Sequence, residues 1–273
     1  MDRCVWLLLV ALTLFPVRCE AATRRLTAAF TSTSLVLVPV HVNSRGPYYF
    51  VIDTGATTTT LDDRLATELR IQPTGTLEIV TSGGTFGAPV GRVDELAIDT
   101  LRMTSLEVSW MPLDELRRDD RRIMGVIGQD VLSKTTVVID YARRRVALTP
   151  EPCGGNDAMI DVAWAGGRPM IDAGVHGRGL PSSAKLVLDS ASNALLLFAR
   201  ADATGQITKV STHRNTVTAD VLPRVTVDVA GARRAGPAVL LPPAAARTES
   251  GLLPTAWYSV VCIDGPRQRA TLR

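Results

Sequence analysis

The chain has 273 residues, enough for one large β domain or for two lobes of roughly 100–150 residues each. Its formal net charge is only +3, its basic residues are spread along the chain and aromatic residues make up 5%, so we expect no nucleic-acid partner. The three histidines, His41, His176 and His213, lack a paired metal-ligand spacing, and no phosphate-cradling loop is present. We therefore predict neither a metal site nor a cofactor.

The N-terminal segment reads as a targeting signal. Arg3 precedes an apolar run at residues 5–17, and small residues follow at Ala21 and Ala22. The run is shorter than the ~20 residues that a membrane-spanning helix needs. We expect a signal peptide over residues 1–21, a polar lead-in segment over 22–34, and a periplasmic or secreted protein. An uncleaved signal would instead tether the protein to a membrane.

Two of the four cysteines, Cys4 and Cys19, lie within the predicted signal peptide, which leaves Cys153 and Cys262 in the mature chain. A pair of cysteines in an exported protein is compatible with one disulfide. Two buried free thiols are the alternative, and the sequence leaves both open.

The first half begins with a predicted β-hairpin that ends in an acidic turn. Residues 35–42 and 48–53 are β-type runs, separated by a turn at residues 43–47. The second run carries Asp53 to its end and then turns at Thr54 and Gly55. An Asp at the end of a buried strand is costly unless it is paired or used in chemistry, although Asp and Gly are also ordinary turn residues.

The segments that follow continue the β pattern. Asp62 is predicted to cap a short helix over residues 63–69. Residues 77–93 suggest a mobile hairpin with a polar tip at residues 82–87, and residues 114–122 form a charged loop or short helix. The sequence GVIGQDVL at residues 125–132 predicts a strand that turns into a helix, and residues 135–149 predict a hairpin.

The second half repeats these landmarks in the same order. The sequence LVLDSAS at residues 186–192 echoes the Asp53 stretch, and residues 250–257 echo residues 124–131. The strands predicted at residues 260–264 and 269–272 echo those at 137–140 and 145–148. We therefore predict two similar lobes, an N-terminal one over residues 35–150 and a divergent C-terminal one over residues 151–273.

These motifs identify a family resemblance. The sequences VIDTGA at 51–56, GVIGQDVL at 125–132 and VIDY at 138–141 resemble those of retropepsin-like aspartic proteases, most of all exported bacterial ones with two lobes in one chain. The resemblance extends from about residue 35 to residue 272 and is looser in the second half. It implies an all-β, bilobal acid-protease fold with short helices, in which two β-barrel-like lobes are related by a pseudo-twofold axis.

The resemblance also implies a function and a site. The protein would be an aspartic endopeptidase in which Asp53 and Asp189 share one proton and activate a water molecule. Thr54, Gly55 and Ser190 would form the active-site turns. Residues Gly83, Gly84 and Thr85 would belong to a flap that closes over an extended peptide or unfolded protein substrate.

The second half departs from the family pattern at two positions. Ala191 stands where a glycine is expected, in a tight turn that could need positive φ, and Pro254 stands where Gly128 stands in the first half. Two alternatives follow. Either two chains pair their Asp53 residues in a homodimer through the first lobe, or the protein is a catalytically inactive exported binding or scaffold protein. The intact first motif favours the peptidase, whereas Ala191 and Pro254 favour the inactive protein. The sequence leaves open whether the dyad forms within a monomer or between the first lobes of a homodimer.

Overall fold

The computed structural model describes residues 26–81, 84–155, 157–199, 206–211, 216–243 and 247–273. The predicted signal peptide, residues 22–25 of the lead-in segment and the predicted flap residue Gly83 lie outside these ranges. Within them, no helix has the length and apolar character required to cross a membrane.

The first lobe is an eight-stranded sheet in the order β1-β2-β3-β8-β4-β7-β6-β5, with an extra β2–β6 pairing that curls it into a barrel-like shape. Its strands are β1 (Ala29–Phe30), β2 (Val36–Val42), β3 (Arg45–Ile52), β4 (Thr60–Asp62), β5 (Pro73–Thr81), β6 (Gly84–Ile98), β7 (Leu101–Met111) and β8 (Ile123–Ile127). Its helices are α1 (Asp63–Glu68), α2 (Asp114–Asp119) and α3 (Gln129–Leu132).

The second lobe is also an eight-stranded sheet, in the order β12-β13-β14-β19-β15-β18-β17-β16, with an extra β13–β17 pairing. Its strands are β12 (Ala163–Ala165), β13 (Arg168–His176), β14 (Ser183–Asp189), β15 (Leu195–Phe198), β16 (Gln206–Ser211), β17 (Thr216–Val229), β18 (Ala232–Leu241) and β19 (Gly251–Pro254). Position by position, this order repeats that of the first lobe. The predicted all-β, bilobal fold is confirmed.

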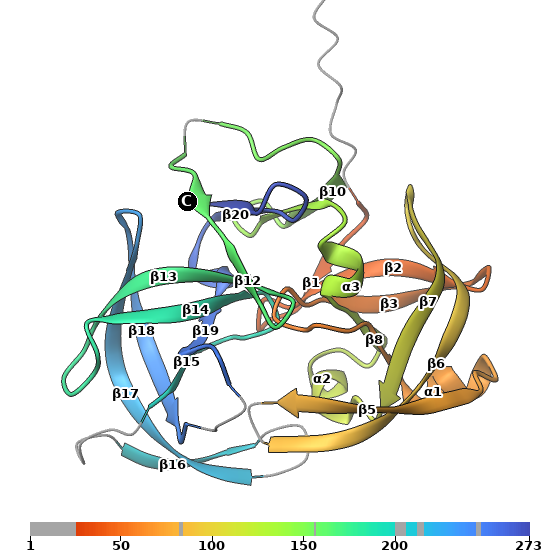
Figure 1. Ribbon diagram of the computed structural model, residues 1–273, viewed down its shortest axis with the longest axis horizontal. Coiled ribbons are helices and arrows are strands. Elements are labelled where there is room, and N and C mark those ends of the chain that lie inside the picture. Colours follow the sequence, from red (N-terminus) through yellow and green to blue (C-terminus); the bar gives the residue numbers. More distant parts are fainter. Residues whose placement is uncertain (1–25, 82–83, 156, 200–205, 212–215, 244–246) are drawn as a thin grey trace, which may run out of the picture.

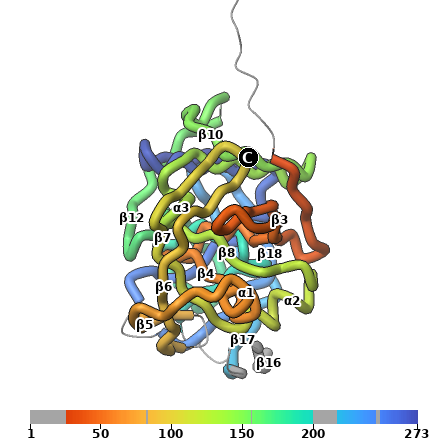
Figure 2. Tube along the Cα trace, turned by 90° about the vertical axis from the view of Figure 1, so that its right-hand side faces the viewer, coloured from red at the N-terminus to blue at the C-terminus, as the bar shows by residue number. Residues whose placement is uncertain are grey.

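A third sheet joins the two lobes. Its order is β10-β9-β20-β21-β11, built from β9 (Thr136–Asp140), β10 (Arg145–Thr149), β11 (Ile160–Asp161), β20 (Val260–Asp264) and β21 (Arg269–Leu272). The central pair, β9 and β20, comes from opposite halves of the chain. In Figure 1 this sheet lies at the top, with the second lobe on the left and the first on the right. Figure 2 looks at the first lobe, with the second lobe behind it.

Each lobe has its own apolar core. One core cluster draws its members from residues 36–146 and includes Phe50 and Ile52, both fully buried. A second draws on residues 162–272 and includes Leu186 and Leu188, also fully buried. The side chain of Tyr141 packs against both clusters, at the joining sheet. The strands that lead to the two acidic turns are therefore anchored in separate cores.

A long hairpin at the end of each sheet is also repeated in the two lobes. The β5–β6 hairpin of the first lobe corresponds to the β16–β17 hairpin of the second, and both lie at the end of the molecule away from the joining sheet (Figure 1). The sequence predicted only the first of these hairpins. The second was missed because its strands carry no glycine-rich tip like the one at residues 83–87.

Two turns are shorter in the structure than the sequence predicted. The turn predicted at residues 43–47 is only two residues long, Asn43 and Ser44, both with positive φ, and β3 begins at Arg45. The predicted tip at residues 82–87 is also too long, because Thr85 pairs with Val80 within the hairpin. In both places cross-strand pairing extends further than the turn-forming residues suggested.

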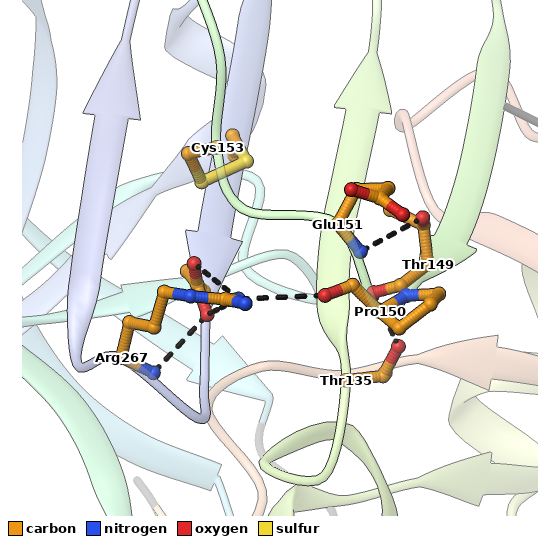
Figure 3. The surroundings of a disulfide bond; sticks show 8 residues. Thr135, Thr149, Pro150, Glu151, Cys153 and Arg267 are labelled. Carbon is orange, nitrogen blue, oxygen red and sulfur yellow. Dashed lines mark hydrogen bonds and ion pairs between the residues drawn. A yellow bond between two sulfur atoms is a disulfide. The ribbon is translucent and has the colours of Figure 1, made fainter. Parts of the chain in front are cut away.

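A disulfide fastens the second half to the joining sheet. Cys153, in the segment after β10, is bonded to Cys262 on β20, and both side chains are nearly buried (Figure 3). Arg267 adds a contact nearby, because its guanidinium donates to the Pro150 carbonyl oxygen at 3.4 Å.

The helix predicted over residues 63–69 is present as α1, and Asp62 caps it by accepting a hydrogen bond from the Arg64 amide at 3.1 Å.

Candidate active site

Asp53 stands at the exit of a fully buried strand. Phe50, Val51 and Ile52 of β3 have no exposed surface, and the Asp53 amide donates to the Ile127 carbonyl oxygen of β8 at 3.1 Å. The chain then turns, and Oδ1 of Asp53 accepts hydrogen bonds from the amides of Gly55 at 2.8 Å and Ala56 at 3.0 Å. The turn thereby fixes one oxygen of the carboxylate.

Asp189 has the same surroundings in the second lobe. It ends β14, and its Oδ1 accepts hydrogen bonds from the amides of Ala191 at 2.8 Å and Ser192 at 2.9 Å. The alanine that replaces the expected glycine therefore keeps the amide contact of the turn. The concern about positive φ is unfounded, because neither Gly55 nor Ala191 is among the residues with positive φ.

Crossed hydrogen bonds lock the two turns together. Thr54 Oγ1 donates to the Leu188 carbonyl oxygen at 2.6 Å and accepts from the Ser190 amide at 3.0 Å. In return, Ser190 Oγ donates to the Ile52 carbonyl oxygen at 2.7 Å and accepts from the Thr54 amide at 3.0 Å. Thr54 and Ser190 are both buried. This reciprocal pattern is what a local twofold axis between the lobes requires.

Gly55 is needed because of the opposite lobe. A Cβ atom at this position would lie 2.7 Å from both Cγ and Oδ2 of Asp189, closer than unbonded atoms approach. The same distance shows how near the two acidic turns come. The structure thus brings Asp53, Thr54, Gly55, Asp189 and Ser190 into one cluster within a single chain.

The two carboxyl groups perturb each other's ionisation. Burial is the largest effect on Asp53, followed by the charge of Asp189, and together they raise its pKa to about 8 against the opposing effect of the turn amides. Burial also raises the pKa of Asp189, while its turn amides and the charge of Arg168 act in the opposite direction. Two carboxyl groups so placed do not ionise independently, so one can act as an acid while the other acts as a base.

A cleft of about 690 Å³ runs past the two acids. Residues of both lobes line it, and the β5–β6 hairpin contributes residues 77–81 of β5. The predicted flap residues Gly84 and Thr85 belong to this hairpin but are not among the lining residues. The reason is topological, since β5 is the edge strand of its sheet and β6 pairs behind it.

The helix α3 supports the first turn from behind. Gln129 Nε2 donates to the Thr54 carbonyl oxygen at 2.8 Å, and the Gln129 amide donates to the Ala56 carbonyl oxygen at 2.9 Å. Gly128 allows this approach, because a Cβ there would lie 2.6 Å from the Thr58 carbonyl carbon. In the second lobe Pro254 takes this place, and Thr255 after it hydrogen-bonds through Oγ1 to the Tyr141 hydroxyl at 2.6 Å. Different contacts therefore support the two turns.

Sequence reasoning missed three charged residues that line the same cleft. Arg168, Arg247 and Glu249 belong to the second lobe, and both arginines form ion pairs with Glu249, at 2.8 and 3.0 Å. Arg168 begins β13, whereas Arg247 and Glu249 precede β19, so the three residues come from two separate parts of the chain. An alignment of the two halves of the chain could have singled out these three residues, because some of the residues at the equivalent positions of the first half are uncharged.

Comparisons with known proteins found a matching family and a similar solved structure. Residues 38–131 match a family described as "Aspartyl protease". Among solved structures, the chain is similar to a retropepsin-like aspartic protease from Rickettsia conorii, with 17% sequence identity, a TM-score of 0.33, and coverage of 44% of this chain and 86% of that one. No curated protein matches the sequence.

Proposed function

We propose that this chain is a retropepsin-like aspartic endopeptidase whose acids are Asp53 and Asp189, and the aspartyl protease match over residues 38–131 supports the proposal. The observation that carries the proposal is the reciprocal bonding of Thr54 and Ser190, which holds the two acidic turns against each other. The raised pKa of both carboxyl groups supports it, because one shared proton is what the chemistry needs.

The reaction needs only the two acids and water. The ionised carboxylate removes a proton from a water molecule as the water oxygen bonds to the peptide carbonyl carbon, and the protonated carboxyl donates its proton to the carbonyl oxygen. The resulting tetrahedral diol then collapses. Its C–N bond breaks, the nitrogen receives a proton from the dyad, and a hydroxyl proton returns to the carboxylate. The dyad ends with one proton, as it began.

The cleft suits an extended peptide. Its wall includes β5, the last strand in the order of its sheet, so a peptide can bind along this strand as an added one. A volume of about 690 Å³ accommodates a short peptide segment. The substrate class we propose is therefore an unfolded protein or flexible peptide segment. Because Asp53 and Asp189 belong to one chain, a monomer can carry the complete dyad.

An exported location fits the same proposal. The disulfide between Cys153 and Cys262 supports it, because such bonds persist in oxidising compartments. The predicted signal peptide over residues 1–21 is the sequence feature on which the location depends. Cell fractionation of the full chain, with N-terminal sequencing of the mature protein, tests both.

Turnover is tested with an unfolded protein as substrate across acid to neutral pH. We expect the wild-type protein to cleave it, and the variants Asp53→Asn and Asp189→Asn to lose at least about a thousandfold in rate while keeping the fold. Asp140→Asn, in the β9–β10 turn, is the matched control and should keep full activity.

Two other outcomes would redirect the assignment. Full activity of Asp189→Asn would rule out the intramolecular dyad and leave pairing of Asp53 between two chains. Folded wild-type protein without cleavage at any pH would favour the inactive binding protein that Ala191 and Pro254 suggested. The hydrogen bond from the Ala191 amide to Asp189 supports the active enzyme, since the second turn keeps its form.

A further inference from the structure

The side chains of Arg168, Glu249 and Arg247 form a charged cluster in the second-lobe wall of the cleft. Arg168 Nη2 lies 2.8 Å from Glu249 Oε2, and Arg247 Nη1 lies 3.0 Å from Glu249 Oε1. Glu249 is almost completely enclosed, with 1% of its side chain exposed, so a single carboxylate is shared by two guanidinium groups. The three side chains together have a net charge of +1, and the positive charge of Arg168 also acts on the carboxyl groups of Asp53 and Asp189.

The first lobe has apolar residues at the places equivalent to Arg168 and Glu249. Leu37 pairs with Val51, two residues before Asp53, and Met170 pairs with Val187, two residues before Asp189. Leu35 stands two residues before Leu37, and Arg168 stands two residues before Met170. Leu35 and Arg168 are therefore equivalent positions, related by the pseudo-twofold axis. Both line the cleft.

The same relationship holds for the partner of Arg168. Gly125 pairs with Phe50 on β3, and Gly251 pairs with Leu186 on β14. Two residues before these glycines stand Ile123 in the first lobe and Glu249 in the second. Ile123 shares an apolar cluster with Leu35, whereas Glu249 is ion-paired with Arg168. An apolar pair on one side of the dyad is thus matched by an ion pair on the other.

Arg168 retains hydrogen-bonding capacity. Its Nε atom is buried and has no hydrogen-bond partner, although 18% of the side chain is exposed to solvent. A guanidinium carries five N–H donors, and Glu249 uses only some of them. An added carboxylate would pair with this group and neutralise the excess charge of the cluster.

Arg247 places the cluster under the first-lobe hairpin. Its guanidinium stacks 3.9 Å from the ring centroid of Phe198, and its Nη2 donates to the carbonyl oxygen of Thr81 at the end of β5. A peptide held between β5 and the dyad would therefore pass beside the charged cluster.

We propose that Arg168, supported by Glu249 and Arg247, forms a carboxylate-binding subsite of the cleft. The peptide position on the second-lobe side of the scissile bond would then be acidic, and the position beside Leu35 apolar. This inference rests on the proposed peptidase function, and it names the substrate class of that site.

Paired peptides test the subsite. Amidated fluorogenic peptides of one cleavable sequence carry Glu at each position near the scissile bond in turn, with Gln as the isosteric reference. We expect one position at which Glu raises kcat/KM about tenfold over Gln. In the double variant Arg168→Leu/Glu249→Ile, which copies the Leu35–Ile123 pair, this ratio should fall to about one. An unchanged ratio in that variant would overturn the proposal.

A second variant and a control keep the result interpretable. Arg168→Met leaves Glu249 paired with Arg247, and should also lose the Glu preference if the double variant fails to fold. Arg143→Gln removes an arginine from an ion pair outside the cleft and should keep the preference. Free-acid versions of the Gln peptides show whether a C-terminal carboxylate binds as well as an internal Glu. A preference for either kind of carboxylate supports the subsite, and a lack of preference for both would refute it.

Binding separates this proposal from the proposed enzyme activity. The same peptides are titrated against the variant Asp53→Asn and followed by fluorescence anisotropy. About tenfold tighter binding of the preferred carboxylate peptide, lost on Arg168→Met, supports the subsite even if the wild-type protein cleaves nothing. Equal affinity for Glu and Gln peptides in this assay would refute the subsite while leaving the peptidase assignment intact.

Discussion

Thr54 and Ser190, which are 136 positions apart in the sequence, each donate a side-chain hydrogen bond to the backbone of the strand that carries the other. Each also accepts a hydrogen bond from the other's backbone amide. Because all of these groups are buried, neither lobe can shift without leaving several of them unpaired. The relative position of Asp53 and Asp189 therefore depends on two hydroxyl groups that take no direct part in the proposed reaction.

The first prediction concerns this contact. Thr54→Val should destabilise the protein by about 2–4 kcal/mol, because the Leu188 carbonyl and the Ser190 amide would both lose a buried partner. It should also reduce kcat strongly, whereas Thr54→Ser, which keeps the hydroxyl, should retain much of both. Urea unfolding and peptide cleavage measure the two effects. Thr135→Val, which breaks a buried bond to the Thr149 carbonyl outside the cleft, should cost stability but little activity. Wild-type activity in Thr54→Val would contradict this account.

The second prediction is the alkaline limit of activity. With the pKa of Asp53 near 8, the dyad keeps its shared proton below that pH and loses it above. We expect kcat/KM to fall as the pH rises through about 8, because no acid then remains to protonate the carbonyl oxygen. The measurement is a pH–rate profile with the folded fraction followed in parallel. A rate that stays level up to pH 10 would be inconsistent with a shared proton.

The third prediction is a stabilising substitution. The pKa of Asp53 is raised on folding, so the folded protein binds more protons than the unfolded chain between about pH 4 and pH 8. The free energy of unfolding should therefore decrease as the pH rises through this window. Asp53→Asn removes that loss and should be more stable than wild type at pH 7 by a few kcal/mol, with the difference shrinking toward pH 4. Thermal unfolding at both pH values tests the sign, and equal differences at the two would refute it.

The fourth prediction compares the two equivalent turn positions. Gly55→Ala places a methyl group 2.7 Å from the Asp189 carboxyl, so we expect loss of activity and about 1–3 kcal/mol of destabilisation. Ala191→Gly changes the equivalent position of the second turn and keeps the amide that bonds Asp189. It should retain activity and change stability by less than about 1 kcal/mol. Similar effects of both substitutions would show that the space beside Asp189 is not the constraint.

Local sequence patterns predicted much of the first lobe. The run of apolar residues before Asp53 indicated a buried strand with an acid at its end, and Asp62 indicated the start of α1. The family-matched motifs extended this to the second lobe, where LVLDSAS repeats the strand and its acid. These features depend on residues that are close in the sequence, so local sequence patterns are enough to predict them.

Other features depend on residues that are distant in the sequence. The requirement for glycine at position 55 comes from Asp189 in the other lobe, so no reading of the turn itself could distinguish it from Ala191. Likewise Arg168 and Glu249 are 81 positions apart in the sequence, and only the fold places their side chains 2.8 Å from each other.

The order of buried strands, the two acids and the duplicated plan follow from the sequence, because hydrophobic pattern and turn chemistry act over a few residues. The charged wall opposite Leu35 was decided by the packing of distant segments within the second lobe. The pairing of Thr54 with Ser190 and the shared environment of the acids were decided only when two separately packed cores met. Their energies arise from burial between lobes, and burial at that interface is a property of the folded chain rather than of any segment of it.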